Sequence, residues 1–527
     1  MHIRWLLLFG GIFFSTQLVA QESVNWANFN YIKASNGWLT SENAAGLDKL
    51  SVDKISFIEA TFNKQNGDFI NYFQSDNSYS FGASTESFYR INKLVFYGQM
   101  QYTNFSGKNM GGSTLFNPGF SPFDIVEFAD STAGTKNMEQ YYLTGALSIP
   151  VNNNLTLGLK TNYYTASYYK TKDLRHTNDI MNLETTLGLS YSFNSLVDVG
   201  MNYYFRKRTE NTSYQSEGNT DQQFNSLISY GSFFGLQENF GNEGMTGSTD
   251  NNPLVDFIHG VSFQLELFAG NNFNIFNDLG FKWRNGYFGQ KSSVDIQYTE
   301  HQANKISYKG VISLNRNRTL HQLSINFDYE DLINLEKSYS KSTDEGGNTT
   351  ILYFGKNQVL DRVHSKASFL YSGNINVNDN NPEWLINAGI SIWRRDQLSV
   401  TYPFYRRQDI QQFLATASLK KNIFSNSNMF SFTVGAQYGS GTGTDKEDGQ
   451  FANALKNYAT LDNILYREYE FLTTRRASGN AAFRYTKAFP ANFKIYGGVG
   501  FDYTKAFDVS YSGNTYRKVA LNIGYIF

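Results

Sequence analysis

Apolar and polar residues alternate one by one over most of the chain. In the segment 197–206, for example, Val197 and Val199 fall on one face while Asp198 and Gly200 fall on the other. Because the side chains of a β-strand point alternately to its two faces, a period of two predicts strands with one apolar and one polar face. We find no convincing run at helical spacing after the first twenty residues, so the expected fold class is all-β.

The alternating segments number about 18, within a range of 16 to 20. They are expected at 52–63, 78–90, 93–105, 138–150, 155–168, 182–193, 197–208, 256–268, 276–287, 304–315, 320–332, 362–374, 384–394, 411–421, 429–440, 475–487, 493–505 and 517–527. Short turns rich in Asn, Gly and Pro, such as 152–154 and 489–492, alternate with long polar stretches such as 209–255 and 441–470. Short periplasmic turns and long extracellular loops are typical of a transmembrane antiparallel up-and-down β-barrel.

A membrane barrel explains the one-sided strands better than a stack of sandwiches. The alternation continues through residues 51–527 without a linker, whereas soluble sheets of this length normally divide into several domains. A closed barrel pairs every backbone group and presents its apolar face to lipid. We therefore expect one barrel domain at 51–527, surrounded by membrane lipid.

The first twenty residues have the pattern of an export signal. A basic start is followed by the apolar stretch 5–14, and the small residue Ala20 suits a cleavage site. We expect residues 1–20 to be a cleaved signal peptide. The chain contains no Cys, which excludes disulfides, thiolate metal sites and cysteine nucleophiles.

Composition narrows the function classes. The 527 residues include 45 Lys and Arg against 46 Asp and Glu, so the formal net charge is -1 and gives no reason to expect nucleic acid as a partner. Aromatic residues make up 17% of the chain. The mean hydropathy of -0.43 argues against a membrane protein built of apolar helices.

The last strand carries a more specific signal. Residues 519–527 alternate up to Tyr525 and Phe527, and this ending resembles the C-terminal signal by which outer-membrane proteins of Gram-negative bacteria are recognised and inserted. The whole chain looks like the porin-like, mostly uncharacterised outer-membrane barrels of those envelopes. The resemblance implies location in the cell outer membrane and contact with the barrel-insertion machinery.

Residues 21–50 precede the first strand and form a candidate plug. The run from Asn43 through Gly46 to Leu47 (Asn-Ala-Ala-Gly-Leu) is similar to an Asn-Pro-Ala-Gly-Leu stretch near the N-terminus of fatty-acid-type outer-membrane transporters. In that family the N-terminal segment acts as a hatch. Here Ala44 replaces the proline, and the expected strand count exceeds that family's. The plainer interpretation is an N-terminal arm tucked into the barrel.

If the apolar face meets lipid, the polar face lines the lumen. The basic residues expected there are Lys160, Arg206, Arg208, Lys282, Arg284, Lys309, Lys366, Arg476, Arg484 and Lys494. The acidic residues are Glu184, Asp198, Glu266, Asp328, Glu330 and Asp502. The basic excess points to a preference for anions, and the alternative is that these groups form solvated ion pairs without selectivity. Two apolar loop segments, 115–128 and 230–236, could constrict the pore, bind a ligand or pack against each other.

No pattern of catalytic residues stands out. The histidines are not spaced as metal ligands, and nothing near His176 or His301, in expected outer loops, suggests a nucleophile system. We therefore expect no enzymatic activity, no metal and no cofactor. The leading hypothesis is passive passage of small solutes through a porin-like channel. The alternatives are a non-transport subunit or loop-mediated binding partner of an envelope complex, and a hatch-gated transporter of hydrophobic compounds.

Overall fold

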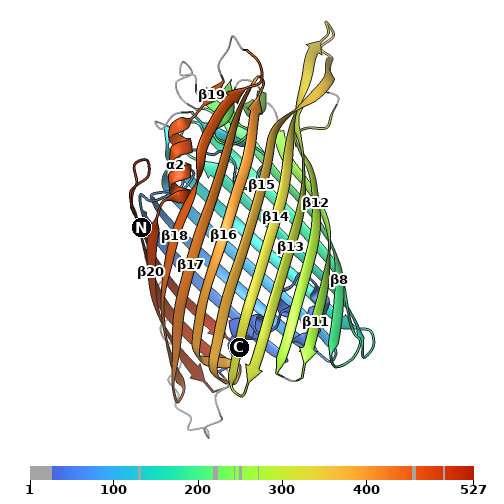
Figure 1. Cartoon of the computed structure of the whole chain (residues 1–527), viewed down its shortest axis with the longest axis vertical. Coiled ribbons are helices and arrows are strands. Elements are labelled where there is room, and N and C mark those ends of the chain that lie inside the picture. The colour runs from blue at the N-terminus through green and yellow to red at the C-terminus, as the bar shows by residue number, and fades with distance from the viewer. Residues whose placement is uncertain are drawn as a thin grey trace, which may run out of the picture.

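The computed structural model describes residues 26–128, 132–217, 224–241, 244–247, 252–270, 272–292, 294–453, 458–490 and 493–527. The expected signal peptide at 1–20 lies outside these residues. The described chain folds around one 18-stranded antiparallel sheet that closes into a barrel (Figure 1). Its strands are β1 (Lys54–Gly67), β2 (Asn77–Ile91), β3 (Leu94–Met110), β5 (Gly134–Pro150), β6 (Leu155–Lys170), β7 (Arg175–Ser192), β8 (Val197–Gln215), β11 (Asn252–Ala269), β12 (Phe273–Gly289), β13 (Gln297–Arg316), β14 (Thr319–Thr343), β15 (Thr349–Asn378), β16 (Asn381–Thr401), β17 (Phe404–Ser425), β18 (Asn428–Gln450), β20 (Arg476–Phe489), β21 (Phe493–Ala506) and β22 (Thr515–Ile526).

Closure of the barrel joins its first and last strands. β1 pairs with β22 in register from Phe57↔Ile526 to Gly67↔Tyr516, so the sheet has no free edge. The backbone of Phe527 exchanges two hydrogen bonds with Ser56, both 3.0 Å long. The predicted all-β class, the closed antiparallel barrel and the count of 18 strands are confirmed.

The outer face is apolar. Leu187, Val434 and Ile523 are 56%, 55% and 61% exposed, and similar side chains recur on the outside of every part of the wall. So much exposed apolar surface is compatible with lipid and not with water. The fold is therefore that of a transmembrane barrel.

The two ends of the barrel differ. Short turns lie at the lower end in Figure 1, and the longer connections lie at the upper end. By analogy with other membrane barrels we call these the periplasmic and extracellular ends. Several strands run further towards the extracellular end than expected; β15 spans Thr349–Asn378, whereas the pattern predicted 362–374. In the extension of β15 the consecutive apolar residues Ile351 to Phe354 fall on both faces, so the contrast between faces disappears.

The periplasmic half of the lumen holds residues 26–50, which we call the N-terminal arm. It contains α1 (Phe29–Ala34) and two short 3-10 helices, η1 (Trp38–Thr40) and η2 (Ala44–Lys49). In Figure 1 this dark blue segment is seen between the wall strands near the lower end. Asn28 and Asn43 begin α1 and η2, because each side-chain oxygen accepts a hydrogen bond from a backbone N–H two or three residues further on.

The extracellular end holds a second body, which we call the loop assembly. It is a four-stranded sheet of β4 (Asp124–Glu127), β9 (Asn225–Ser229), β10 (Phe234–Asn239) and β19 (Ala459–Thr460), together with the loop 111–123, η4 (Gly244–Thr246) and α2 (Asp462–Thr473). The two apolar loop segments pack against each other, as one of the sequence interpretations held: Ile125 and Tyr230 share one apolar cluster, and Val126 and Phe233 share another.

α2 corrects the expectation that the chain after the signal has no helix. Leu461, Ile464 and Leu465 are grouped with Tyr72 and Phe233 in one apolar cluster, and Leu465 is fully buried. These apolar positions are few and lie among Asn, Arg, Glu and Tyr residues, which hid their helical spacing. Within the described residues, no helix is long and apolar enough to cross a membrane.

Candidate functional site

The N-terminal arm is bound to widely separated parts of the barrel wall. Three polar contacts show this, on β2, β8 and β11. Lys33 pairs with Glu86 at 2.5 Å and Lys49 pairs with Asp198 at 2.6 Å. The indole N–H of Trp38 donates to Glu266 at 2.7 Å. β8 and β11 are neighbours, but the arm also contacts β16, where the side-chain amide of Asn381 donates to the backbone oxygen of Trp26 at 2.9 Å. The arm therefore crosses the lumen instead of following one side of it.

Asn43, from the run similar to fatty-acid-type transporters, is at the centre of this docking and only 1% exposed. Its amide donates to the backbone oxygen of Leu189 and to the side-chain oxygen of Gln264, both at 2.9 Å. Leu47 of the same run packs in an apolar cluster that includes Phe88 of β2. The run thus joins the arm to β7 and β11 by polar contacts and to β2 by apolar ones.

The wall makes room for the arm with glycines. A Cβ atom on Gly158 would lie 2.0 Å from the backbone nitrogen of Ala45, and one on Gly188 would lie 2.0 Å from Oδ1 of Asn43. Gly46, the third predicted plug residue, lies equally close to Trp38 within the arm: a Cβ atom on Gly46 would lie 2.8 Å from the Cβ of Trp38. Only glycine allows such close approach of two backbones.

Buried ion pairs within the wall hold two arginines against the loop assembly, and Arg284 donates to the backbone oxygen of Phe120 at 3.0 Å. Asp256 of β11 accepts hydrogen bonds from Arg284 and His301, both at 2.6 Å, and pairs with Arg208 at 3.4 Å. The ring of Phe120, in the loop 111–123, covers the guanidinium groups of Arg284 and Arg208 at 4.0 and 5.0 Å from its centroid. These cations are neutralised and shielded from water.

Further round the wall, two arginines bind the loop assembly directly. Arg395 of β16 donates to both carboxylate oxygens of Glu468 in α2, at 3.0 and 2.7 Å. Arg406 of β17 donates to Asp448 at 2.6 and 2.8 Å and to the backbone oxygen of Ser232 at 3.1 Å. Far round the wall from β16, Lys170 of β6 pairs with Glu127 of β4, so the loop assembly also spans the lumen.

Two acids within the loop assembly have pKa values raised to near neutral pH. Burial raises the pKa of Asp124 in β4 to about 7, although hydrogen bonds from Ser113 and Tyr72 oppose the shift. Burial likewise raises the pKa of Glu238 in β10 to about 7. Protonation of these groups is thus linked to the folding of the loop assembly.

The predicted lumen residues fall into four groups. Those that contact the N-terminal arm are Lys282, Lys309, Lys494 and Glu266, and Lys160 borders a small cavity beneath it. Those that contact the loop assembly are Arg206, Arg208, Arg284 and Arg476. Asp328 pairs with Lys305 at 2.8 Å, and Lys366 forms no hydrogen bond or ion pair with any residue that the structure describes. Arg484 belongs to the recess described below.

Two wall cations escaped the sequence analysis. Lys420 lies one residue after Leu419, an apolar residue that is 37% exposed, so parity alone could have placed Lys420 inside. Arg362 is 7% exposed, and its Nε and Nη2 atoms have no hydrogen-bond partner within the described residues. Arg362 is the first residue of the expected strand 362–374 but lies well inside β15.

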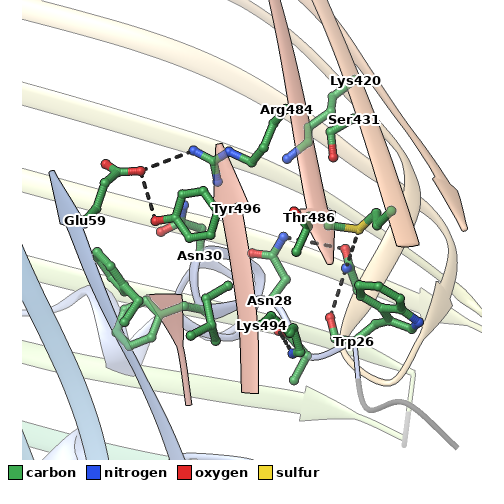
Figure 2. A pocket seen from close by; sticks show the side chains of 16 residues that line it. Trp26, Asn28, Asn30, Glu59, Lys420, Ser431, Arg484, Thr486, Lys494 and Tyr496 are labelled. Atoms are coloured by element: carbon green, nitrogen blue, oxygen red, sulfur yellow. Dashed lines mark hydrogen bonds and ion pairs between the residues drawn. The ribbon is translucent and has the colours of Figure 1, made fainter. Parts of the chain in front are cut away.

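A cavity remains beside each of the two closures. One of about 550 Å³ is lined by aromatic and apolar residues together with polar ones: Phe69, Ile70, Phe73, Phe105, Met110, Phe116, Met138, Tyr168, Phe471, Tyr516, Gln65, Gln74, Gln437, Arg476, Ser75, Ser78, Ser478 and Thr504. Another, of about 140 Å³, lies between the arm and the wall and is drawn in Figure 2. Convergent polar groups in such cavities are typical of ligand sites.

Metal and catalytic chemistry find no support at these positions. No group of three or more metal-ligating side chains occurs in the part of the chain that the structure describes. His176 and His301 lie on β7 and β13 and not in loops, which corrects their expected position. His301 binds Asp256, and His176 binds Asn178 at 2.7 Å.

Taken together, the fold and the site define the class: an outer-membrane-type β-barrel whose lumen is occupied near both ends. The chain belongs to a family of unknown function, DUF6850, whose model matches residues 44–527. No curated protein matches the chain.

Three solved structures to which the chain is similar are those of one receptor and two transporters. The ferric preacinetobactin receptor BauA of Acinetobacter baumannii is 8% identical, with a TM-score of 0.38 over 90% of this chain and 80% of that one. The outer membrane transporter YddB of Escherichia coli is 6% identical, with a TM-score of 0.41 over 89% and 80%. The toluene transporter TodX of Pseudomonas putida is 10% identical, with a TM-score of 0.29 over 96% and 95%.

Proposed function

We propose that this protein is a gated barrel of the outer membrane that passes a small solute when the N-terminal arm leaves the lumen. The observation that carries the proposal is the arm itself, which is bound to β2, β8 and β11 at once. A lumen crossed by a bound segment favours gating over the freely open porin-like channel, which stays a prediction.

The arm is suited to move because it is a single segment held by separable contacts. Its ion pairs with the wall keep the lysine side partly solvated: the Lys33 and Lys49 side chains are 33% and 29% exposed, whereas those of Glu86 and Asp198 are 9% and 6% exposed. Its apolar contacts fall into two clusters, one around Phe29 and Leu47 and a smaller one of Trp38 with Phe276 and Val311.

The test is single-channel conductance of the refolded full-length protein in a planar bilayer. It is compared with a variant lacking residues 26–50, one in which a Gly-Ser linker replaces residues 225–239 of the loop assembly, and one with both changes. Two closures in series predict low conductance for the wild type, small increases for each single change and a much larger one for the double change. A wild type that conducts as well as the double variant would overturn gating. Heat-modifiable electrophoretic mobility verifies that each barrel has folded.

The cavity of about 550 Å³ favours a second candidate, transport of hydrophobic compounds, because seven of its lining side chains are aromatic: Phe69, Phe73, Phe105, Phe116, Tyr168, Phe471 and Tyr516. Toluene uptake into proteoliposomes tests this candidate. Uptake that Phe105→Gln and Tyr168→Gln do not reduce would count against it. The role as a subunit of an envelope complex stays a prediction, and crosslinking in intact membranes tests it.

A further inference from the structure

Two adjoining cavities lie where α1 meets the wall formed by β1, β17, β18 and β20–β22. Their volumes are about 140 and 340 Å³. Both are lined by Asn30, Lys420, Ser431 and Arg484, so we treat them as one recess. Figure 2 shows the Lys420, Ser431 and Arg484 side chains at the same end of this recess.

The recess carries more positive charge than its acid can balance. Glu59, the acidic residue that lines it, already accepts hydrogen bonds from Tyr496 and Asn522, both at 2.9 Å, and from Arg484 at 3.4 Å. Lys420 forms no hydrogen bond or ion pair with the described residues, and its charge repels that of Arg484.

The larger cavity is built from groups that bind anions. No carboxylate lines it, and its polar side chains are Asn30, Thr61, Asn63, Lys420, Ser431, Thr433, Arg484 and Asn522. Arg484 is held in place by stacking on Tyr496, with its guanidinium 4.4 Å from the ring centroid. A guanidinium, an ammonium and hydroxyl groups around one space form the donor set that carboxylates and phosphates take.

The N-terminal arm supplies one side of the recess. Asn30 lines both cavities, and residues 26–29 line the smaller one. Lys494, which also lines the smaller cavity, donates to the backbone oxygen of Ala27 at 3.3 Å. A ligand in the recess would therefore touch both the wall and the arm.

We propose that this recess binds the carboxylate or phosphate group of a small solute, and that the arm completes the site. The inference rests on the proposed function, since it names the chemical class of the solute that the gated barrel takes up. Binding is then linked to arm docking: loss of the arm removes one side of the site and lowers affinity, and the bound anion in turn holds the arm in place.

Isothermal titration of the folded full-length protein in phosphatidylcholine nanodiscs tests the site, with inorganic phosphate and succinate as probes in chloride buffer. We expect saturable binding of at least one probe, weakened by about tenfold or more in Lys420→Gln and in Arg484→Gln. Lys366→Gln is the matched control, because it removes the same charge from an exposed lysine without a partner on β15. The control should leave the affinity unchanged, and Lys420→Arg should retain binding.

Two results would overturn the anion site: no saturable binding of either probe, or equal weakening by Lys366→Gln, which would indicate charge screening alone. Because the titration needs no passage of solute, its outcome is separate from that of the conductance test. A freely conducting wild type that still binds phosphate through Lys420 would end the gating proposal alone. A gated protein without saturable anion binding would end this inference alone.

Discussion

The two closures of the lumen are built differently. The N-terminal arm is one segment of 25 residues, 26–50, that contacts the wall through a few ion pairs and two apolar clusters. The loop assembly is made from several connections between strands, has its own sheet and is held by buried wall arginines, Arg284 at Phe120 and Arg395 at Glu468. We therefore expect the arm to leave the lumen as a unit, whereas the loop assembly would have to break many contacts to open.

The largest expected effect comes from taking away the space in which the arm lies. Gly188→Leu places a side chain where Oδ1 of Asn43 now lies, so the arm should be expelled while the barrel stays closed. Trypsin should then cleave at Lys33 and Lys49 far faster than in the wild type. Gly145→Leu is the control, since a Cβ there meets no atom within 4 Å. Equal protection of the arm in both variants would contradict the docking described.

A second large effect is expected in the loop assembly. Asp256→Asn leaves Arg208 and Arg284 buried without their shared carboxylate, and breaking such a buried pair costs about 3–5 kcal/mol. Hydrogen exchange of the sheet β4–β9–β10 should accelerate, while exchange in the arm should not change. Asp328→Asn is the control: its pair with Lys305 is about half exposed, with the Asp328 side chain at 45%. Such a pair contributes about 1 kcal/mol or less. If hydrogen exchange became faster only in the arm, the difference described between the arm and the loop assembly would be contradicted.

A smaller effect is expected for one arm contact. Trp38→Phe removes the hydrogen bond to Glu266 but keeps an aromatic ring against Phe276. The lost bond to a charged group is worth about 1.5–3 kcal/mol. Tryptic cleavage of the arm should therefore become faster, but less so than in Gly188→Leu. An unchanged cleavage rate would show that the Trp38 contact does not hold the arm.

The smallest effect concerns pH. The pKa of Asp124 and that of Glu238 are about 7 in the folded loop assembly, above the ordinary carboxyl value of about 4 in unfolded chains. Between pH 4 and 7 the folded form binds more protons, so its stability falls as the pH rises through this window and is level above it. Intrinsic-rate-corrected hydrogen exchange of β4 and β10 should be slower at pH 5 than at pH 8. Asp124→Asn should reduce this difference, and the arm should show none from these two groups.

The barrel could be predicted from the sequence because lipid on one side and polar surroundings on the other impose a period of two. Strong contrast at Leu187 and Leu189 located β7, and the turn at 152–154 located β5 and β6. The extracellular extension of β15 was missed because its apolar residues, Ile351 to Phe354, follow one another without alternation. α2 was missed because Leu461 and Leu465 stand among polar residues.

The site could be predicted only in part. Parity placed charged residues on the polar face, but partners such as Asp256 and Arg208, 48 positions apart, are brought together by β8–β11 pairing that no local pattern shows. The Asn43 run drew attention to the arm, yet its wall contacts depend on glycines more than a hundred residues away, Gly158 and Gly188. The cationic recess could not be predicted because its residues come from three strands that are distant in the sequence. Lys420 was overlooked because it lies next to Lys421.

The most direct test of the docked arm uses the absence of native cysteine. Leu47→Cys lies in the arm's buried cluster, where Leu47 is 7% exposed, and Asp53→Cys lies at the exposed rim just beyond it. In folded protein, we expect a water-soluble maleimide to label the Leu47→Cys protein much more slowly than the Asp53→Cys protein. Adding Gly188→Leu should remove that protection. Equal labelling of the two positions without Gly188→Leu would show that the arm does not occupy the lumen.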